Sequence, residues 1–170
     1  MIEKFTFELS SPKVRKKLVL VKSEMELRSH VVLKMLSFLL FYDPGLEVEA
    51  EIGMHYKPDL SIPNENKIPE LWIDCGHIAL RKVRNLAKKL RRTRFILVKA
   101  SKSELDRFRR EMENKVEYSE AIEYLAFENG FVEKIAEALN RTNDVTLYDV
   151  MENVIGIALN GEVFESALYR

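Results

Sequence analysis

The alternation of apolar and polar positions near the start of the chain predicts a β-hairpin. Phe5, Phe7 and Leu9 alternate with polar residues, which is the period of a strand with one face toward solvent. Residues 10–12, Ser-Ser-Pro, are a turn signal, and residues 17–21 can return as the second strand. The chain is therefore expected to open with two paired strands.

A helix is predicted next, because apolar residues recur at helical spacing between Val31 and Leu40. Ser23 is followed three residues later by Glu26, which is the pattern of a capping box, so the helix is expected to begin at Ser23. Residues 43–45, Asp-Pro-Gly, predict its end.

Three strands are predicted after this helix. Residues 46–52 alternate between apolar and acidic side chains, as a half-buried strand does, and a short strand follows at 57–62. Residues 71–75, Leu-Trp-Ile-Asp-Cys, are mostly apolar, which is typical of a central strand covered on both faces. The remaining elements are expected in this order: helix 78–90, strand 95–98, helix 103–110, strand 122–127, helix 131–139, and strands 145–150, 154–159 and 163–168.

The order of these elements predicts a mixed α/β (α+β) fold. A mixed central sheet is flanked by helices, and further strands are added at the N- and C-terminal ends; the last two strands join through a hairpin at Asn160-Gly161. The chain contains no internal repeat and no low-complexity linker, so one domain is expected over residues 1–170.

Composition narrows the class of protein. Hydrophobic residues make up 46% and charged residues 32% of the chain, as in globular proteins. The 27 Lys and Arg residues balance the 27 Asp and Glu residues, which excludes a uniformly basic nucleic-acid binder. Cys75 is the only cysteine, so no intrachain disulfide can form and a cytoplasmic location is expected. No signal peptide and no apolar run long enough to span a bilayer is found, so no membrane partner is expected.

Charge is unevenly distributed along the chain. Residues 1–110 carry 23 basic and 14 acidic residues, whereas residues 111–170 carry 4 and 13. The densest basic run lies between Arg81 and Arg94 and contains no acid. A solvated helix face is one interpretation of this run, pairing with the acidic second half of the chain is another, and contact with phosphates is a third. For the third, the candidate nucleic-acid-binding residues are Arg81, Arg84, Lys88 and Lys89.

Two aspartates on neighbouring predicted strands are the candidate catalytic and metal-binding residues. Asp59 follows Pro58, and Asp74 lies on the strand 71–75, fifteen positions later. Carboxylates on adjacent strands can share a hard divalent cation such as Mg²⁺ or Mn²⁺, which activates water and neutralises charge on a phosphate. Lys82, on the edge of the following helix, is the candidate cation beside them, and Glu26 is added as a further metal ligand.

Each candidate also has a purely structural interpretation. Asp59 follows a proline and can simply form a turn, Glu26 can cap its helix, and Lys82 is one cation among many on its helix. Asp74 is different, because an unpaired carboxylate inside an apolar strand costs several kcal/mol. A metal ion, lysine or arginine is therefore expected beside Asp74. Cys75 is interpreted as a small core residue rather than a nucleophile.

The acid pair and the order of the elements around it resemble the PD-(D/E)XK nuclease-like core. A second resemblance, to the YaeQ family, covers nearly the whole chain and includes residues 70–76; its most specific part is residues 71–76, Leu-Trp-Ile-Asp-Cys-Gly. It also rests on residues 29–38, 57–60 and 145–164. The YaeQ resemblance implies the nuclease-like fold and a protein without an established biochemical role.

The sequence departs from these resemblances at two places. Gly76 occupies the position where the nuclease motif has lysine, so Lys82 is taken as a lysine that has migrated, with Arg81 as the second choice. The YaeQ glycine is often followed shortly by Pro-Asp-Glu, whereas this chain continues His77-Ile78-Ala79.

Two functions are therefore kept open. The first is a Mg²⁺- or Mn²⁺-dependent phosphodiesterase that acts on nucleic acid. The second is a binding or regulatory module on a nuclease-like scaffold that has lost catalysis and contacts nucleic acid or a protein partner.

Overall fold

The computed structural model describes residues 1–66 and 68–170 and, at positions 149 and 150, the backbone only. Four α-helices and ten strands occur in these residues. The helices are α1 (Arg28–Leu40), α2 (Leu80–Lys89), α3 (Lys102–Met112) and α4 (Phe131–Ala138). The strands are β1 (Glu3–Ser10), β2 (Arg15–Lys22), β3 (Glu47–Val48), β4 (Leu60–Ile62), β5 (Leu71–Cys75), β6 (Arg94–Lys99), β7 (Ile122–Phe127), β8 (Thr142–Met151), β9 (Val154–Leu159) and β10 (Glu162–Tyr169).

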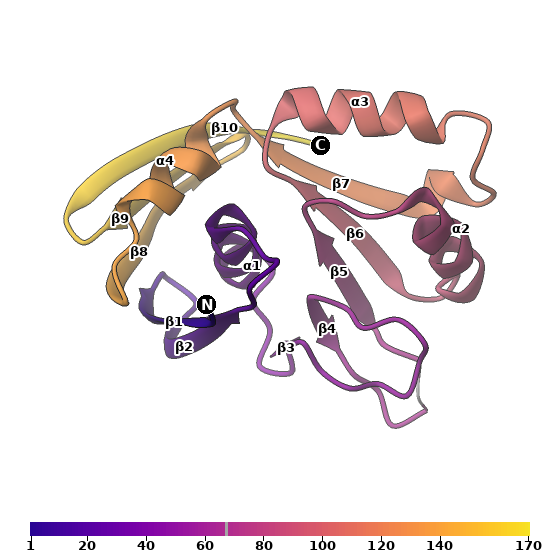
Figure 1. Ribbon diagram of the computed structural model, residues 1–170, viewed down its shortest axis with the longest axis horizontal. Coiled ribbons are helices and arrows are strands. Elements are labelled where there is room, and N and C mark those ends of the chain that lie inside the picture. The colour runs from indigo at the N-terminus through magenta and orange to yellow at the C-terminus, as the bar shows by residue number, and fades with distance from the viewer. Residues whose placement is uncertain (67) are drawn as a thin grey trace.

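The ten strands form one mixed sheet in the order β2-β1-β8-β9-β10-β7-β6-β5-β4-β3. The pairs β1–β8, β5–β6 and β6–β7 are parallel, and the others are antiparallel. The sheet curves around α1 and α4, while α2 and α3 lie outside the curve against the half that contains β5, β6 and β7 (Figure 1). The expected mixed α+β class, with strands added at both ends of the chain, is confirmed.

The curved sheet separates two hydrophobic cores. The inner core joins α1 and α4 to the sheet and includes Leu36, Ile73 and Ile135, all at most 1% exposed. The outer core lies under α2 and α3 and includes Trp72, Leu86 and Leu97, all fully buried. Because side chains alternate along a strand, β5 contributes Ile73 to the inner core and Trp72 to the outer core. The next residue on the outer side of β5 is Asp74.

Three expectations about the elements around α1 and β4 are wrong. The helix begins at Arg28 rather than Ser23, because Leu27 has extended backbone angles; the Ser23–Glu26 segment forms a separate turn instead. The expected strand 46–52 is reduced to β3, because Glu49 has a left-handed backbone (φ 50°) that breaks the alternation. The expected strand 57–62 contains only β4 at its end.

The later helices are found close to their expected positions. Ser101 rather than Ser103 caps α3, accepting a hydrogen bond from Glu104 N–H at 3.2 Å. In the described part of the chain, none of the helices has the length and apolar composition needed to cross a bilayer.

Candidate functional site

Asp59 and Asp74 lie at the same end of two paired strands. The antiparallel register of β4 and β5 places Leu60 opposite Ile73, so a continued ladder would place Asp59 opposite Asp74. The ladder instead shifts at this point, because Asp59 N–H donates to the Ile73 carbonyl at 3.1 Å. The Asp59 side chain therefore reaches toward α1 while Asp74 stays on the side of α2.

The Asp59 carboxylate is held by the backbone of β5 and by α1. Its Oδ2 accepts a hydrogen bond from Cys75 N–H at 2.7 Å and lies 3.1 Å from His30 Nε2. Burial raises the pKa of Asp59, but the hydrogen bond and charge of His30 outweigh burial, so the net shift is downward. Burial lowers the pKa of His30, and Asp59 reverses that shift as well, so that the pKa of His30 is raised.

A series of ion pairs extends from His30 along α1. Glu26 Oε1 lies 2.7 Å from His30 Nδ1 and 2.6 Å from Lys34 Nζ. Lys34 is only 1% exposed and also contacts Glu49 Oε1 at 3.0 Å. Burial lowers the pKa of Lys34, but its two carboxylate partners outweigh burial and raise it. Glu49 directly follows β3, and its left-handed backbone ends that strand while its side chain pairs with the buried Lys34.

The Asp74 carboxylate lies on the opposite face of β5 and is 5% exposed. Its Oδ2 accepts a hydrogen bond from Trp72 Nε1 at 2.9 Å and lies 3.2 Å from Lys82 Nζ. Burial raises the pKa of Asp74, Lys82 lowers it, and the charge of Asp59 raises it again, so the net shift is upward. Each aspartate thus has its own cation, His30 for Asp59 and Lys82 for Asp74.

Lys82 is positioned by α2 and by a loop that precedes β4. The helix begins just after β5, which brings the Lys82 ammonium over the end of that strand. This ammonium also lies 5.8 Å from the centroid of the Tyr56 ring. The hydroxyl of Tyr56 in turn accepts a hydrogen bond from Asn85 Nδ2 at 2.9 Å, so α2 and the loop are tied together beside Asp74.

The backbone at Gly76 has a conformation that favours glycine. Its φ is +74°, a left-handed conformation that is unfavourable for any residue with a Cβ. A Cβ built at this position meets His30 Cδ2 at 3.6 Å, which is ordinary contact. The constraint at position 76 is therefore the backbone conformation rather than lack of space.

Lys99, which the sequence reasoning missed, lies beside Gly76. It follows Val98, the β6 partner of Cys75, and is 4% exposed. Its ammonium donates to the Gly76 carbonyl at 2.6 Å and lies 4.0 Å from the centroid of the Phe108 ring. Burial lowers the pKa of Lys99 to about 8. The available signal was the alternation along β6, which places this lysine on the same face as Leu97 and hence as Asp74.

The Asp59 and Asp74 carboxylates contact opposite helices, α1 and α2, and each keeps one oxygen without a partner among the described residues. Within the described residues, every hydrogen bond and ion pair of Asp59 and Asp74 goes to Oδ2, which leaves Oδ1 of each for another ligand. Mg²⁺ is commonly held by one or two carboxylates, with water and substrate phosphate as the other ligands. No three His, Cys, Asp or Glu side chains in the described part of the chain are grouped so as to hold one ion, and Glu26 is occupied by His30 and Lys34.

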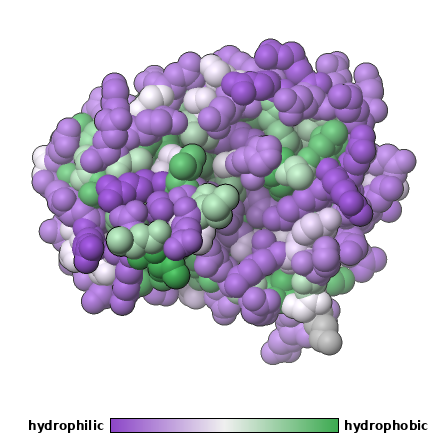
Figure 2. All heavy atoms as spheres, in the orientation of Figure 1, coloured by the Kyte–Doolittle hydropathy of each residue, from purple (hydrophilic) through white to green (hydrophobic). Residues whose placement is uncertain are grey.

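The four candidate nucleic-acid-binding residues all lie exposed on α2. Arg84 Nε donates to the Lys115 carbonyl at 2.8 Å, and Lys88 Nζ lies 3.8 Å from Glu117. The acidic second half of the chain thus pairs with part of the basic run. Arg94 adds a further pair, because its Nε and Nη2 donate to the two Glu123 carboxylate oxygens at 2.7 and 3.0 Å. Figure 2 shows hydrophilic side chains over the part of the surface where α3 lies.

The fold and the charged strand ends define a mixed α+β protein with two carboxylates, the half-buried Asp59 and the buried Asp74, at one end of a curved sheet. The YaeQ protein family model matches residues 16–167, and the chain belongs to this family. It resembles the crystal structure of the YaeQ protein from Xanthomonas axonopodis pv. citri, with a TM-score of 0.79 and 15% identity over 98% of this chain and 95% of that chain.

A YaeQ protein from Pseudomonas syringae has the same fold, with a TM-score of 0.71 and 16% identity over 98% of this chain and 93% of that one. A search of curated proteins finds no match. At these identities the likeness shows the fold alone.

Proposed function

We propose that this YaeQ-family protein is a divalent-metal-dependent phosphodiesterase that acts on nucleic acid. The observation that carries the proposal is a pair of carboxylates at the ends of adjacent strands, the half-buried Asp59 and the buried Asp74. The charge of Asp59 raises the pKa of Asp74, and the hydrogen bonds of both go to Oδ2. A buried carboxylate near a like charge opposes folding, and such groups concentrate at functional sites.

The chain's own residues would orient the two acids and bind the substrate. Trp72 and Lys82 fix the Asp74 side chain, and the Cys75 amide and His30 fix Asp59. A Mg²⁺ or Mn²⁺ ion bound by both acids would supply an activated water and neutralise charge on the phosphate. The ammonium of Lys82 would stabilise charge that develops on the phosphate oxygens.

The similarity to the PD-(D/E)XK nuclease-like core supports the same proposal. The order α1-β3-β4-β5-α2-β6 is the helix, strand, strand, strand, helix, strand order from which the resemblance was drawn. In this proposal Asp59 and Asp74 correspond to the two acidic positions of that core. The positive φ of Gly76 disfavours a lysine at the third position, and Lys82 would supply an ammonium from α2 instead.

A cleavage assay tests the proposal. Labelled DNA and RNA, single- and double-stranded, are incubated with Mg²⁺, with Mn²⁺ or with EDTA. Metal-dependent cleavage is expected for the wild type and for Asp106→Asn, whose carboxylate lies on the exposed surface of α3 with Lys102. Asp74→Asn and Asp59→Asn are expected to lower the rate at least about 100-fold. Cleavage that persists in Asp74→Asn, or no cleavage of any substrate, would overturn the proposal.

A non-catalytic binding module is the second candidate. It is favoured by one observation: Asp59 and Asp74 each already have a cation partner, His30 and Lys82. Salt-dependent affinity for nucleic acid without turnover would support this function. Absence of any affinity would leave a protein partner, to be identified by co-purification.

A further inference from the structure

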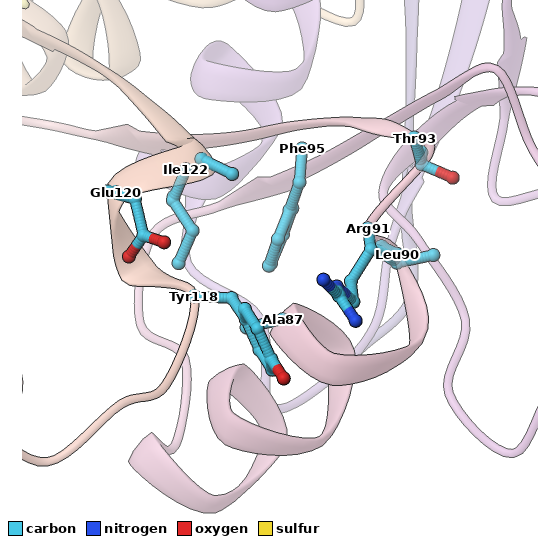
Figure 3. A pocket seen from close by; sticks show the side chains of 9 residues that line it. Ala87, Leu90, Arg91, Thr93, Phe95, Tyr118, Glu120 and Ile122 are labelled. Atoms are coloured by element: carbon cyan, nitrogen blue, oxygen red, sulfur yellow. The ribbon is translucent and has the colours of Figure 1, made fainter.

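A small cavity lies at the end of α2 that is far from Asp74. Its volume is about 190 Å³, and its apolar walls are formed by Ala87, Leu90, Phe95 and Ile122. Drug-sized ligands occupy pockets of about 300–1,000 Å³, so this cavity has room for one planar ring system. Figure 3 shows Phe95 and Ile122 pointing toward the cavity, with Arg91, Tyr118 and Glu120 around its edge.

The edge of the cavity carries an aromatic ring and a cation. Tyr118 is 38% exposed and has a left-handed backbone, with φ of 62°. The guanidinium of Arg91 lies 4.2 Å from the centroid of its ring. In the described part of the chain Arg91 forms no ion pair, so its charge is available to an anion. An aromatic face beside an arginine is the combination on which unpaired bases stack.

The exposed face of α2 connects this cavity to the acid pair. Lys82 in the first turn of α2 contacts Asp74, whereas Leu90 and Arg91 follow its last turn. A helix of ten residues spans about 15 Å, or roughly four nucleotides at the 3.4 Å spacing of B-form DNA. The basic residues Arg81, Arg84 and Lys88 recur every three or four positions along one side of α2, and Arg91 lies just beyond its end. Arg84 and Lys88 also contact the Lys115 carbonyl and Glu117.

We infer that the cavity binds one unpaired base of a single-stranded nucleic acid, whose backbone follows α2 toward the acid pair. The inference rests on the proposed function and names its substrate class. The apolar walls and the Tyr118 ring receive the faces of the base, and Arg91 meets its edge or its phosphate. A base within a duplex is covered by its neighbours and cannot enter such a cavity, so the strand is single.

The test measures binding in EDTA, so that it is independent of cleavage. Single-stranded DNA with one 2-aminopurine base and the matching duplex are titrated with wild type, Tyr118→Phe and Tyr118→Gly. Glycine accepts a positive φ, so Tyr118→Gly removes the ring without straining the backbone. Tyr169→Ala is the matched control, because Tyr169 is another partly exposed tyrosine with a cation, Lys102, 5.8 Å from its ring centroid.

The expected result is about tenfold weaker binding of the single strand by Tyr118→Gly, with loss of the quenching of 2-aminopurine. Tyr118→Phe and Tyr169→Ala should bind like the wild type, and the affinity for duplex should be the same in all four proteins. Equal effects on both substrates, no effect on either, or no binding by the wild type would overturn the inference. Equally tight binding of adenosine monophosphate would also overturn it, since a free nucleotide would then suffice. Metal-dependent cleavage, measured separately, decides the proposed function whichever of these results is found.

Discussion

The two faces of β5 differ in how their charged side chains are paired. On the α1 face, Glu26, Glu49 and Asp59 are matched by His30 and Lys34 at distances of 2.6–3.1 Å. On the α2 face, Asp74 has Lys82 at 3.2 Å and the indole N–H of Trp72 at 2.9 Å. Among the described residues, the Lys99 ammonium has no carboxylate within ion-pair distance and contacts the Gly76 carbonyl and the Phe108 ring.

The pKa shifts on the two faces have opposite signs. On the α1 face the pKa of Asp59 is lowered and those of His30 and Lys34 are raised, so the charged forms are favoured. On the α2 face burial raises the pKa of Asp74 and lowers that of Lys99, so the neutral forms are favoured. Removing one partner of a buried ion pair is strongly destabilising, whereas groups whose charged forms are disfavoured are more frequent at functional sites.

Breaking the satisfied network should have the largest effect on stability. Lys34→Met leaves Glu26 and Glu49 without their shared ammonium, and we expect the free energy of unfolding to fall by about 3 kcal/mol. Urea denaturation at pH 7 measures the change. Lys17→Met, on the exposed side of β2, is the control and should shift the value by less than about 0.5 kcal/mol. A loss of that small size in Lys34→Met would mean that the α1 network does not stabilise the fold.

Removing the unsatisfied lysine should change how stability depends on pH. The pKa of Lys99 is about 8 in the folded protein against 10.5 for an ordinary lysine, so between these values the unfolded chain binds more protons. The wild type should therefore gain stability as pH rises from 7 to 10, by about 1–3 kcal/mol from this group. Lys99→Met should lack this gain, as urea denaturation across that pH range would show. Parallel pH profiles for the two proteins would contradict the described burial of Lys99.

The smallest predicted effect concerns the pairing of His30 with Asp59 on the α1 face. The pKa of His30 is raised above 6.5 by Asp59, so its protonated form stabilises the fold at low pH, and this contribution disappears as pH rises through the folded-state value. Asp59→Asn should lower the pKa of His30, measured from the NMR titration of its Cε1 proton. Asp106→Asn should leave the titration unchanged. If Asp59→Asn also leaves the pKa of His30 unchanged, His30 is not paired with Asp59 in solution.

Local pattern was enough to predict most elements of the fold, because periodicity reports which side chains are buried. It failed at two places. Glu26 accepts a hydrogen bond from Ser23 N–H at 3.2 Å, as in a capping box, but the extended backbone of Leu27 delays the helix to Arg28. Glu49 leaves its strand with a left-handed backbone while its side chain contacts Lys34, fifteen residues away.

In the candidate site, too, some contacts were predictable from local sequence and others were not. A partner for Asp74 was predictable from the cost of burying a carboxylate in an apolar strand, and Lys82 lies within reach of it. Lys99 was missed because alternation along β6 gives only the face on which this lysine lies, whereas its burial also depends on Phe108 of α3. The contact between His30 and Asp59 was also missed, because the two residues lie 29 positions apart in the sequence. The catalytic and metal-binding roles of Asp59, Asp74, Lys82 and Glu26 stay predictions.

Binding of Mn²⁺, followed by electron paramagnetic resonance, tests most directly whether Asp59 and Asp74 share a cation. The account predicts one bound ion in the wild type and in Asp106→Asn, with affinity weaker by about tenfold or more in both Asp59→Asn and Asp74→Asn. Equal affinity in all four proteins, or no binding by the wild type, would contradict it.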